Sequence, residues 1–371
     1  MRCHSMRARV ALLAAFMLAA LASGCGKDHQ SPMAPDELNI ARGGAEEFGL
    51  QNPKVRATIA VQDRHTPDLM RRPGVVGTAT TLTEDGRIAI MVLTEHPLGR
   101  GALPAELDGV PVVEEVSGRI RALDSGANHK TLQTPPIQLG TSGGWRYDLA
   151  NGFCCGGTLG SLVLKSGQQY VLSNYHVLEA DIVSGGNSRV AQAGDPVIQP
   201  GLIDVGCNAN SAQNVATLSG IKSLPGSNVD AAIAATISGQ VRTDGAILDI
   251  GTISATTQAA ALSQAVKKSG RTTGLTRSSV NGLNASVSVA YDNECAGGSA
   301  FTKTFTGQIL VKNKNRGQAF ISGGDSGSLM VQDVTTNPRA VGLLFAGSST
   351  TAVANPIGQV LSFLGATMVG Q

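Results

Sequence analysis

The sequence is poor in aromatic residues and has almost no excess of charge of either sign. Phe, Trp and Tyr make up 4% of the 371 residues, whereas glycine occurs 46 times. Short Val, Ile and Thr runs alternate with Gly, Asn and Ser, which is typical of strands joined by many turns. The net charge is +2, and it becomes −1 without the three arginines of the first 24 residues. This balance gives no indication of binding to nucleic acid.

Histidine and cysteine are scarce where a metal site would need them. His176 is the only histidine after His129. His65 and His96 lie far upstream without metal-ligand spacing, and we expect both at the surface. The cysteines include an adjacent pair but no CxxC motif, so zinc is not expected either. We predict that the protein holds no metal and needs no cofactor.

Residues 1–24 have the proportions of a signal peptide. Three arginines precede an apolar run from Val10 to Ala22 that is too short to span a bilayer comfortably. The following Leu21-Ala22-Ser23-Gly24-Cys25 resembles a bacterial lipobox, in which the cysteine is lipidated. We expect an exported protein, either tethered to the cell envelope at the outer membrane by a lipid on Cys25 or secreted after plain signal cleavage.

Composition divides the remaining chain into four parts. They are a tether (25–54), a small α/β domain (55–123), a Pro- and Gly-containing linker (124–144) and a main domain (145–371). In the small domain the patterns predict strands at 57–61, 75–82, 88–93 and 110–116 and a short helix at 66–70. Its position before the main domain suggests a pro-domain or a folding aid.

A glycine-flanked serine is the candidate nucleophile of the main domain. Gly323-Gly324-Asp325-Ser326-Gly327-Ser328 precedes the apolar pair Leu329-Met330. Glycine permits the sharp turn that would expose the Ser326 hydroxyl, and the amides of Gly324 and Ser326 could bind an oxyanion. A Gly/Ser/Asp surface turn is the alternative.

The serine needs a base and an acid that orients the base. His176 follows a predicted strand at 170–174, and Asp230 opens the apolar stretch 231–234. Asp325 is too close to Ser326 in sequence for this role, and we expect it to shape the loop through backbone or ion-pair contacts. The other aspartates have polar or turn-like neighbours and are expected to be solvated or capping: Asp148, Asp181, Asp195, Asp204, Asp244, Asp249, Asp292 and Asp333.

The order His176, Asp230, Ser326 with Gly-Asp-Ser-Gly resembles the chymotrypsin-like (trypsin-fold) serine peptidases, from near Gly144 to the C-terminus. Gly270–Thr276 and Gly342–Ser348 further resemble a bacterial exported branch with a small N-terminal domain and the narrow-leaf proteins of plants. The resemblance implies a mainly β fold with two antiparallel six-stranded β-barrels and a C-terminal helix. Helical spacing at 356–364 agrees with this.

The resemblance also implies site roles. Ser326 attacks a peptide carbonyl, His176 transfers the proton, Asp230 orients His176, and the amides of Gly324 and Ser326 bind the oxyanion. Phe320, Phe345 and Gly347 fall at substrate-binding positions, which implies a shallow or apolar pocket that does not select Lys or Arg. The chain lacks a clear activation site followed by an apolar residue, so Asp325 needs another partner.

Four cysteines of the main domain are candidates for disulfides in an oxidising compartment: Cys154, Cys155, Cys207 and Cys295. A bond between the adjacent Cys154 and Cys155 would be strained. We therefore expect these two to pair separately with Cys207 and Cys295, in either combination.

The sequence predicts an exported serine endopeptidase that acts on polypeptides. The alternative is a catalytically silent trypsin-fold protein that binds partners or acts as a scaffold in the cell envelope. An α/β-hydrolase is excluded because Ser328 replaces the second glycine of its motif and no histidine follows His176.

Overall fold

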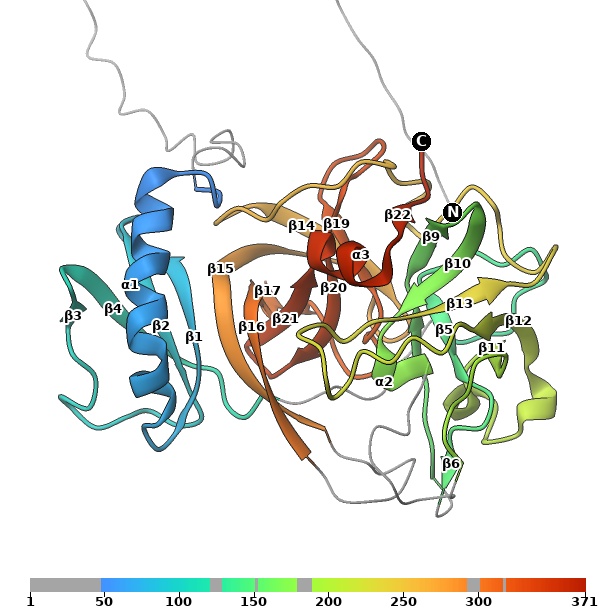
Figure 1. Ribbon diagram of the computed structural model, residues 1–371, viewed down its shortest axis with the longest axis horizontal. Helices are drawn as coiled ribbons and strands as arrows, with labels where there is room; N and C mark the ends of the chain where they lie inside the picture. The colour runs from blue at the N-terminus through green and yellow to red at the C-terminus, as the bar shows by residue number, and fades with distance from the viewer. Residues whose placement is uncertain (1–47, 121–128, 151–152, 179–188, 292–300, 316–317) are drawn as a thin grey trace, which may run out of the picture. The chain divides into compact units, whose positions relative to one another are not determined.

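The computed structural model describes residues 48–120, 129–150, 153–178, 189–291, 301–315 and 318–371 (Figure 1). These residues belong to one compact unit. The predicted signal peptide, residues 25–47 of the predicted tether, and the candidates Cys25 and Cys295 lie outside the described residues. The fold is mainly β, as predicted, with two barrels and an α/β unit that precedes them in the chain.

The first barrel is antiparallel and closes on itself. Its hydrogen-bonded order is β9-β10-β13-β12-β11-β5-β8. Because β8 and β9 are halves of one strand separated only by Gly160, the ring has six strands. The strands are β5 (Thr141–Trp145), β8 (Gly157–Leu159), β9 (Ser161–Lys165), β10 (Gln168–Ser173), β11 (Pro196–Gln199), β12 (Gln213–Leu218) and β13 (Ala232–Thr236).

The second barrel is also antiparallel and six-stranded. Its order is β14-β19-β20-β21-β16-β15, and a further β14–β15 pairing closes the ring. The strands are β14 (Ala265–Gly270), β15 (Gly274–Tyr291), β16 (Phe301–Lys312), β19 (Leu329–Gln332), β20 (Ala340–Gly347) and β21 (Thr351–Pro356).

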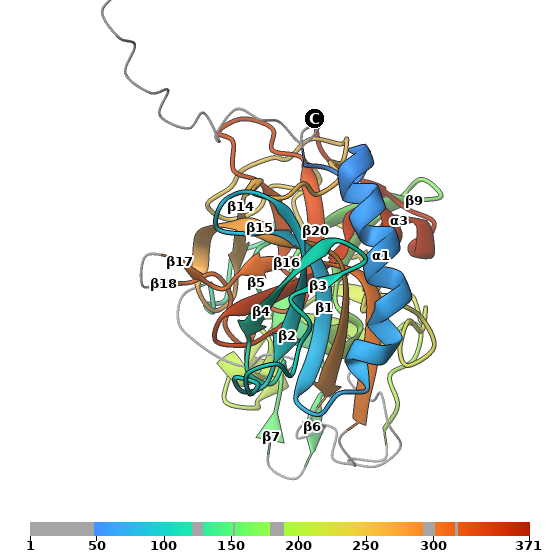
Figure 2. The ribbon, with the colours of Figure 1, turned by 90° about the vertical axis from the view of Figure 1, so that its left-hand side faces the viewer.

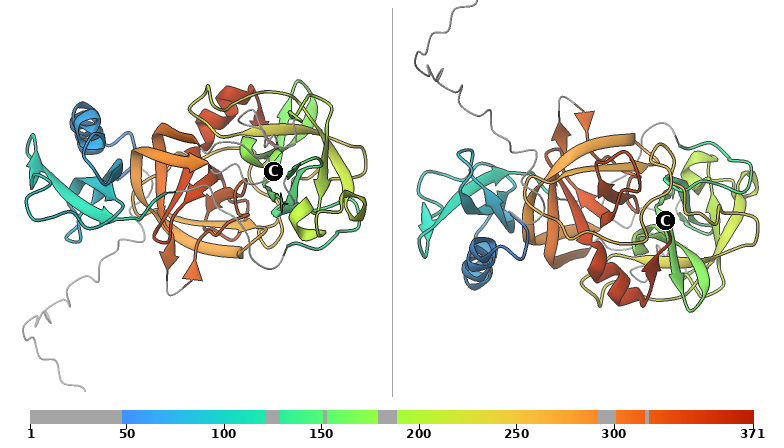
Figure 3. Two further views of the ribbon diagram at one scale, coloured as in Figure 1. Left: turned by 90° about the horizontal axis from the view of Figure 1, so that it is seen from below. Right: turned by 90° about the horizontal axis from the view of Figure 1, so that it is seen from above.

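The N-terminal α/β unit continues the sheet of the second barrel. Strand β1 pairs with β15, for example through Thr78 and Ser286. Figures 2 and 3 show this unit beside β15, with α1 lying along β1 and β2. Its elements are α1 (Pro53–Met70), β1 (Val75–Leu82), β2 (Ile88–Thr94), β3 (Glu106–Leu107) and β4 (Val110–Val116).

The strand expected at 57–61 is wrong, because this segment lies inside α1. Pro53 occupies the first turn, and the Asn52 side chain accepts hydrogen bonds from the first amides. The buried face includes the polar Thr58 and Gln62, which hides the helical period in the sequence. Gln62 binds Thr80 Oγ1 and Thr78 Oγ1 across the interface with β1. The polar face therefore acquires its partners only in the folded protein.

Part of the predicted linker belongs to the first barrel. Ile137 and Leu139 are 0% exposed, and β5 begins at Thr141, before the predicted boundary. Ile137 forms a bridge with Val241, and Leu139 with Ile247. These contacts place the chain from about residue 137 onward against the barrel wall.

The C-terminal helix is confirmed as α3 (Ile357–Leu364), and it ends at Gly365 in the left-handed conformation that glycine favours. Helix α2 (Tyr175–Leu178) directly follows β10. Across the described ranges, no helix is long and apolar enough to cross a membrane. The remaining short elements are η1 (Leu202–Asp204), η2 (Ala209–Ser211), β6 (Leu149–Ala150), β7 (Phe153–Cys154), β17 (Lys314–Asn315), β18 (Gln318–Ala319) and β22 (Thr367–Met368).

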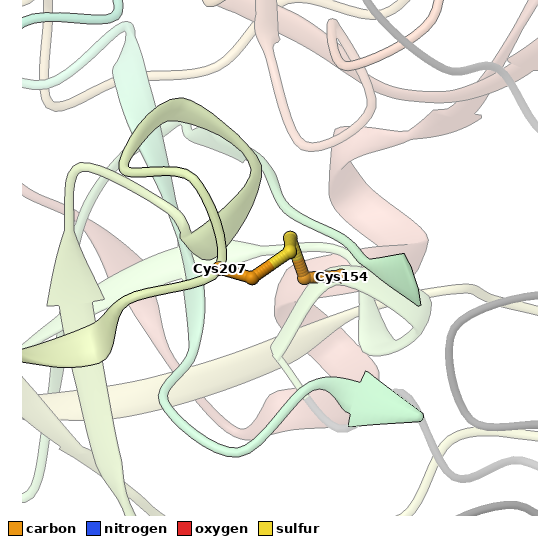
Figure 4. Close-up of a disulfide and its surroundings, with 2 residues drawn as sticks. All are labelled: Cys154 and Cys207. Atoms are coloured by element: carbon orange, nitrogen blue, oxygen red, sulfur yellow. A yellow bond between two sulfur atoms is a disulfide. The ribbon is translucent and has the colours of Figure 1, made fainter. Parts of the chain in front are cut away.

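A disulfide joins Cys154 to Cys207 within the first-barrel half (Figure 4). It links β7 to the turn after η1, with a Cα–Cα distance of 5.6 Å. This is one of the expected pairings. Cys155 is also disulfide-bonded.

Candidate active site

Strand pairing brings His176 and Asp230 together. His176 lies three residues after Ser173 at the end of β10, and Asp230 lies two residues before β13. These strand ends pair through Ser173 and Ala232. His176 Nδ1 lies 2.6 Å from Asp230 Oδ2, and the Asp230 side chain is 0% exposed. The structure thus joins the predicted base to the predicted acid.

Backbone amides hold the other oxygen of this carboxylate. Asp230 Oδ1 accepts hydrogen bonds from Tyr175 N at 2.8 Å and His176 N at 3.3 Å. The Asp230 amide donates to Asn355 Oδ1 at 2.9 Å, and Asn174 donates to the Asp230 carbonyl at 2.7 Å. The segment before β13 is therefore fixed by both barrels.

A fourth donor to the Asp230 carboxylate comes from Tyr291, which sequence reasoning missed. Tyr291 Oη donates to Asp230 Oδ2 at 2.8 Å. Burial raises the pKa of Tyr291 well above its ordinary value of 10.0, and the Asp230 charge adds to this effect. The phenol therefore stays protonated and acts as a donor. No local motif marks Tyr291, because it approaches Asp230 from β15 of the other barrel.

The other ring nitrogen of His176 is available for a reacting group. Nδ1 faces a carboxylate, so it carries the proton in the neutral imidazole and leaves Nε2 as the acceptor. Nε2 is buried and has no hydrogen-bond partner among the described residues. This is the state that a general base requires.

The Ser326 loop lies between the two barrels. Thr158 of β8 donates from its amide to Ser326 O and from its hydroxyl to Gly324 O, both at 2.8 Å. On the other side Gly327 N donates to Leu344 O of β20 at 2.9 Å. Gly324 and Gly327 have φ angles of 82° and 91°, which other residues rarely adopt. The predicted glycine-dependent turn is present, and it is buried.

The Ser326 side chain points to a backbone carbonyl. Its Oγ donates to Phe345 O at 3.4 Å, and no hydrogen bond to His176 is formed. A Cβ on the adjacent Gly327 would collide with the Ser173 hydroxyl, so the serine loop lies against the strand that leads to His176. The structure brings the three predicted residues to one junction without completing the serine–histidine bond.

Two buried amides of the Ser326 loop have no acceptor among the described residues. They are the amides of Gly324 and Ser326. Buried N–H groups nearly always find an acceptor, so these two can receive an anionic oxygen.

The partner of Asp325 is Lys268 of β14. Lys268 Nζ lies 3.3 Å from Asp325 Oδ2, and both side chains are 0% exposed. Burial lowers the pKa of Lys268, and the Asp325 charge partly offsets this. Asp325 also accepts from the amides of Thr272 and Ser322, each at 2.9 Å. The predicted role of Asp325 in shaping the loop through backbone and ion-pair contacts is confirmed.

A second buried ion pair joins the two barrels behind the same loop. Arg271 donates from Nε and Nη2 to the two carboxylate oxygens of Asp204, both at 2.6 Å. A Cβ on Gly324 would collide with the Arg271 guanidinium. The expectation that Asp204 is solvated is wrong, because its partner comes from the other barrel.

The predicted substrate-binding phenylalanines lie in hydrophobic cores. Phe320 is 1% exposed and packs with Met330, and Phe345 is 0% exposed and packs against Phe305. Both side chains are buried without a substrate, and their contact with substrate stays a prediction. Gly347 pairs with Ala352 at the end of β20, and its contact with substrate stays a prediction.

Two closed six-stranded barrels, with His176 and Asp230 from one and the Ser326 loop from the other, form the trypsin-like fold. The family model "Nal1 C-terminal domain" matches residues 227–355, about a third of the chain. No curated protein sequence matches.

The chain is also similar to solved bacterial proteases at low identity. A glutamic acid-specific serine protease shares 19% identity, with a TM-score of 0.41 and coverage of 62% of this chain and 100% of that one. Protease A of Thermobifida fusca shares 21%, with a TM-score of 0.41 and coverage of 63% and 99%. Cellulomonas bogoriensis chymotrypsin shares 22%, with a TM-score of 0.35 and coverage of 58% and 91%. These TM-scores are low, so the fold assignment depends on the strand pairings.

Proposed function

We propose that this protein is an exported serine endopeptidase that hydrolyses peptide bonds through an acyl-enzyme. The observation that carries the proposal is the 2.6 Å contact of His176 Nδ1 with the buried Asp230, beside a glycine-flanked serine loop. A base whose one nitrogen is oriented and whose other nitrogen lacks a protein partner is what serine activation requires.

In the proposed reaction Ser326 Oγ attacks the peptide carbonyl carbon while His176 Nε2 takes its proton. The carbonyl oxygen becomes an oxyanion that accepts from the amides of Gly324 and Ser326. His176 then gives the proton to the leaving amine, which breaks the C–N bond and leaves an acyl-Ser326 ester. Water, deprotonated by His176, hydrolyses that ester and restores the serine.

The proposal requires one local movement. Ser326 Oγ must turn from Phe345 O toward His176 Nε2, a rotation about a single side-chain bond. Catalytic hydrogen bonds are often incomplete without substrate, so this geometry is compatible with activity.

A catalytically silent binding or scaffold protein is the second candidate. The Ser326–Phe345 hydrogen bond favours it, since it occupies the hydroxyl with a backbone acceptor. In that case His176, Asp230 and Tyr291 form a polar structural network only.

Labelling by a fluorophosphonate separates the two candidates, because the reagent forms a covalent bond only with an activated serine. We expect wild-type protein and the exposed α3 control Ser362→Ala to label, and Ser326→Ala to remain unlabelled. His176→Ala should slow labelling by several orders of magnitude with folding intact. Folded wild-type protein that does not label would exclude the peptidase in favour of the scaffold.

We also propose export, with either a lipid anchor on Cys25 or secretion as a soluble protein. The Cys154–Cys207 disulfide supports an oxidising compartment. Mass spectrometry of the mature N-terminus should find a diacylated Cys25 or a cleaved end near it. An intact N-terminus on functional protein would contradict export.

A further inference from the structure

A tyrosine of the second barrel shares an acceptor with the proposed catalytic histidine. Tyr291 Oη lies 2.8 Å and His176 Nδ1 lies 2.6 Å from the same Oδ2 of Asp230. We propose that Tyr291 is a positioning residue of the triad, which holds this oxygen where it orients His176. The inference rests on the proposed peptidase function.

Tyr291 adds a direct restraint on the carboxylate oxygen of Asp230 that faces His176. Oδ1 is held by two backbone amides, whereas Oδ2 has only His176 and Tyr291 as donors among the described residues. Without the phenol, His176 would be the only donor to Oδ2, and the amides on Oδ1 would restrain Oδ2 only through the rigid carboxylate. The Tyr291 hydroxyl adds a direct hydrogen bond to Oδ2 from the other barrel.

Neighbouring rings hold the phenol in place. Phe301 stacks on Tyr291 with 5.0 Å between ring centroids and an interplanar angle of 10°. The His176 ring approaches at 5.8 Å and 65°. Phe305 packs at 6.3 Å from Tyr291 and at 4.9 Å from Phe345, whose carbonyl accepts from Ser326. The aromatic cluster therefore contacts both halves of the site.

The backbone of Tyr291 is also restrained. Tyr291 pairs with Phe301 of β16, and four residues earlier Val287 pairs with Gly77 of β1. A Cβ on Gly77 would collide with the Ser286 carbonyl of β15 and with the Leu93 side chain of β2, so β1 approaches β15 closely. The N-terminal unit thus supports the strand that ends at Tyr291.

The ionisable groups around the phenol set the sign of a pH effect. Asp230 and His176 face it directly, and Lys303 of β16 lies over the neighbouring Phe305 ring at 5.2 Å while donating to Pro225 O. A donor on Asp230 draws its negative charge away from His176. Loss of that donor should therefore strengthen the interaction of the Asp230 carboxylate with a protonated His176.

The test is Tyr291→Phe, which keeps the ring and removes the hydroxyl. We expect the maximal rate of fluorophosphonate inactivation to fall about tenfold with the reagent affinity unchanged. The acidic limb of the rate–pH profile should also move to higher pH. Tyr170→Phe, at a partly buried tyrosine of β10, is the matched control and should change neither quantity.

A second readout separates this inference from the proposed function. The low-field imidazole N–H resonance that disappears in His176→Ala should change its chemical shift in Tyr291→Phe, whether or not the protein labels. An unlabelled wild type with a shifted resonance would reject the peptidase and keep the positioning role. An unchanged rate, pH profile and resonance in folded Tyr291→Phe would overturn the inference, as would a rate loss that only follows unfolding.

Discussion

Asp230 of the first barrel is held by neutral backbone and phenol donors and by an imidazole, whereas Asp325 of the second barrel faces the buried cation of Lys268. Both carboxylates are 0% exposed. A fixed cation beside Asp230 would cancel the charge that stabilises a protonated His176. Asp325 does not contact His176, so a full ion pair can fix the loop. Under the proposed function, Asp230 is the carboxylate that assists proton transfer, and Asp325 is the carboxylate that holds the loop.

The two halves also differ in how they are cross-linked. The first-barrel half carries the Cys154–Cys207 disulfide, while the serine loop depends on Lys268–Asp325 and Arg271–Asp204. A disulfide acts mainly on the unfolded chain, whereas a buried ion pair acts at its own position. Breaking the disulfide and breaking one of the buried ion pairs should therefore have different consequences for activity.

The largest effect is expected from Lys268→Met. It leaves Asp325 buried without its cation, and the free energy of unfolding should fall by about 3–5 kcal/mol. Labelling of Ser326 should be lost even in the molecules that remain folded, because the loop carrying it is no longer fixed. Chemical denaturation and fluorophosphonate labelling measure the two effects.

The adjacent Lys267 provides the matched control. Its Nζ donates to Val334 O at 2.7 Å, away from the serine loop. Lys267→Met should cost only about 1 kcal/mol and leave labelling intact. Equal effects at the two lysines would contradict the special role of Lys268.

The double variant Cys154→Ala/Cys207→Ala should lower the free energy of unfolding by about 2–4 kcal/mol. The labelling rate of the folded fraction should stay close to wild type, because neither sulfur contacts His176, Asp230 or Ser326. Thermal unfolding combined with labelling below the transition checks this. A large rate loss in fully folded protein would show that the disulfide positions the site.

The smallest effect is a divergence of stability and activity at alkaline pH. Burial lowers the pKa of Lys268 in the folded protein below its ordinary value of 10.5. Between the lowered pKa and pH 10.5, the Lys268 side chain is therefore protonated to a greater extent in the unfolded chain than in the folded one. The contribution of Lys268 to the free energy of unfolding therefore rises with pH in this window. Labelling should fall across the same window, because the cation that fixes Asp325 is lost.

Lys268→Arg sharpens this prediction, since a guanidinium keeps its charge throughout. The alkaline loss of labelling should move to higher pH in that variant. Tyr291 has the opposite effect on the pH dependence of stability. Its pKa is raised in the folded protein, so above pH 10.0 the unfolded chain loses the phenol proton first and the contribution of Tyr291 to the free energy of unfolding falls. Denaturation and labelling measured below that pH isolate the lysine, and an unchanged alkaline limb in Lys268→Arg would reject its role.

Much of the fold was predictable because its signals are local. The hairpin of β1 and β2, the strand before His176 and the helix α3 all show their period or turn residues in the sequence. The strand predicted at 57–61 failed because Thr58 and Gln62 are polar yet buried. The hydrogen-bond partners of Gln62 lie in β1 and β15, and no window of sequence contains both sides of these contacts.

The sequence alone determined the candidate chemistry: one histidine in the main domain, an acid before an apolar strand, and a serine between glycines. It could not determine which groups hold them. Lys268 and Tyr291 have no distinctive neighbours along the chain, and each reaches its carboxylate only when two distant strands meet. Residue type and spacing encode reactive groups and turns, whereas burial and long-range contact decide which charges are paired and where each proton is held.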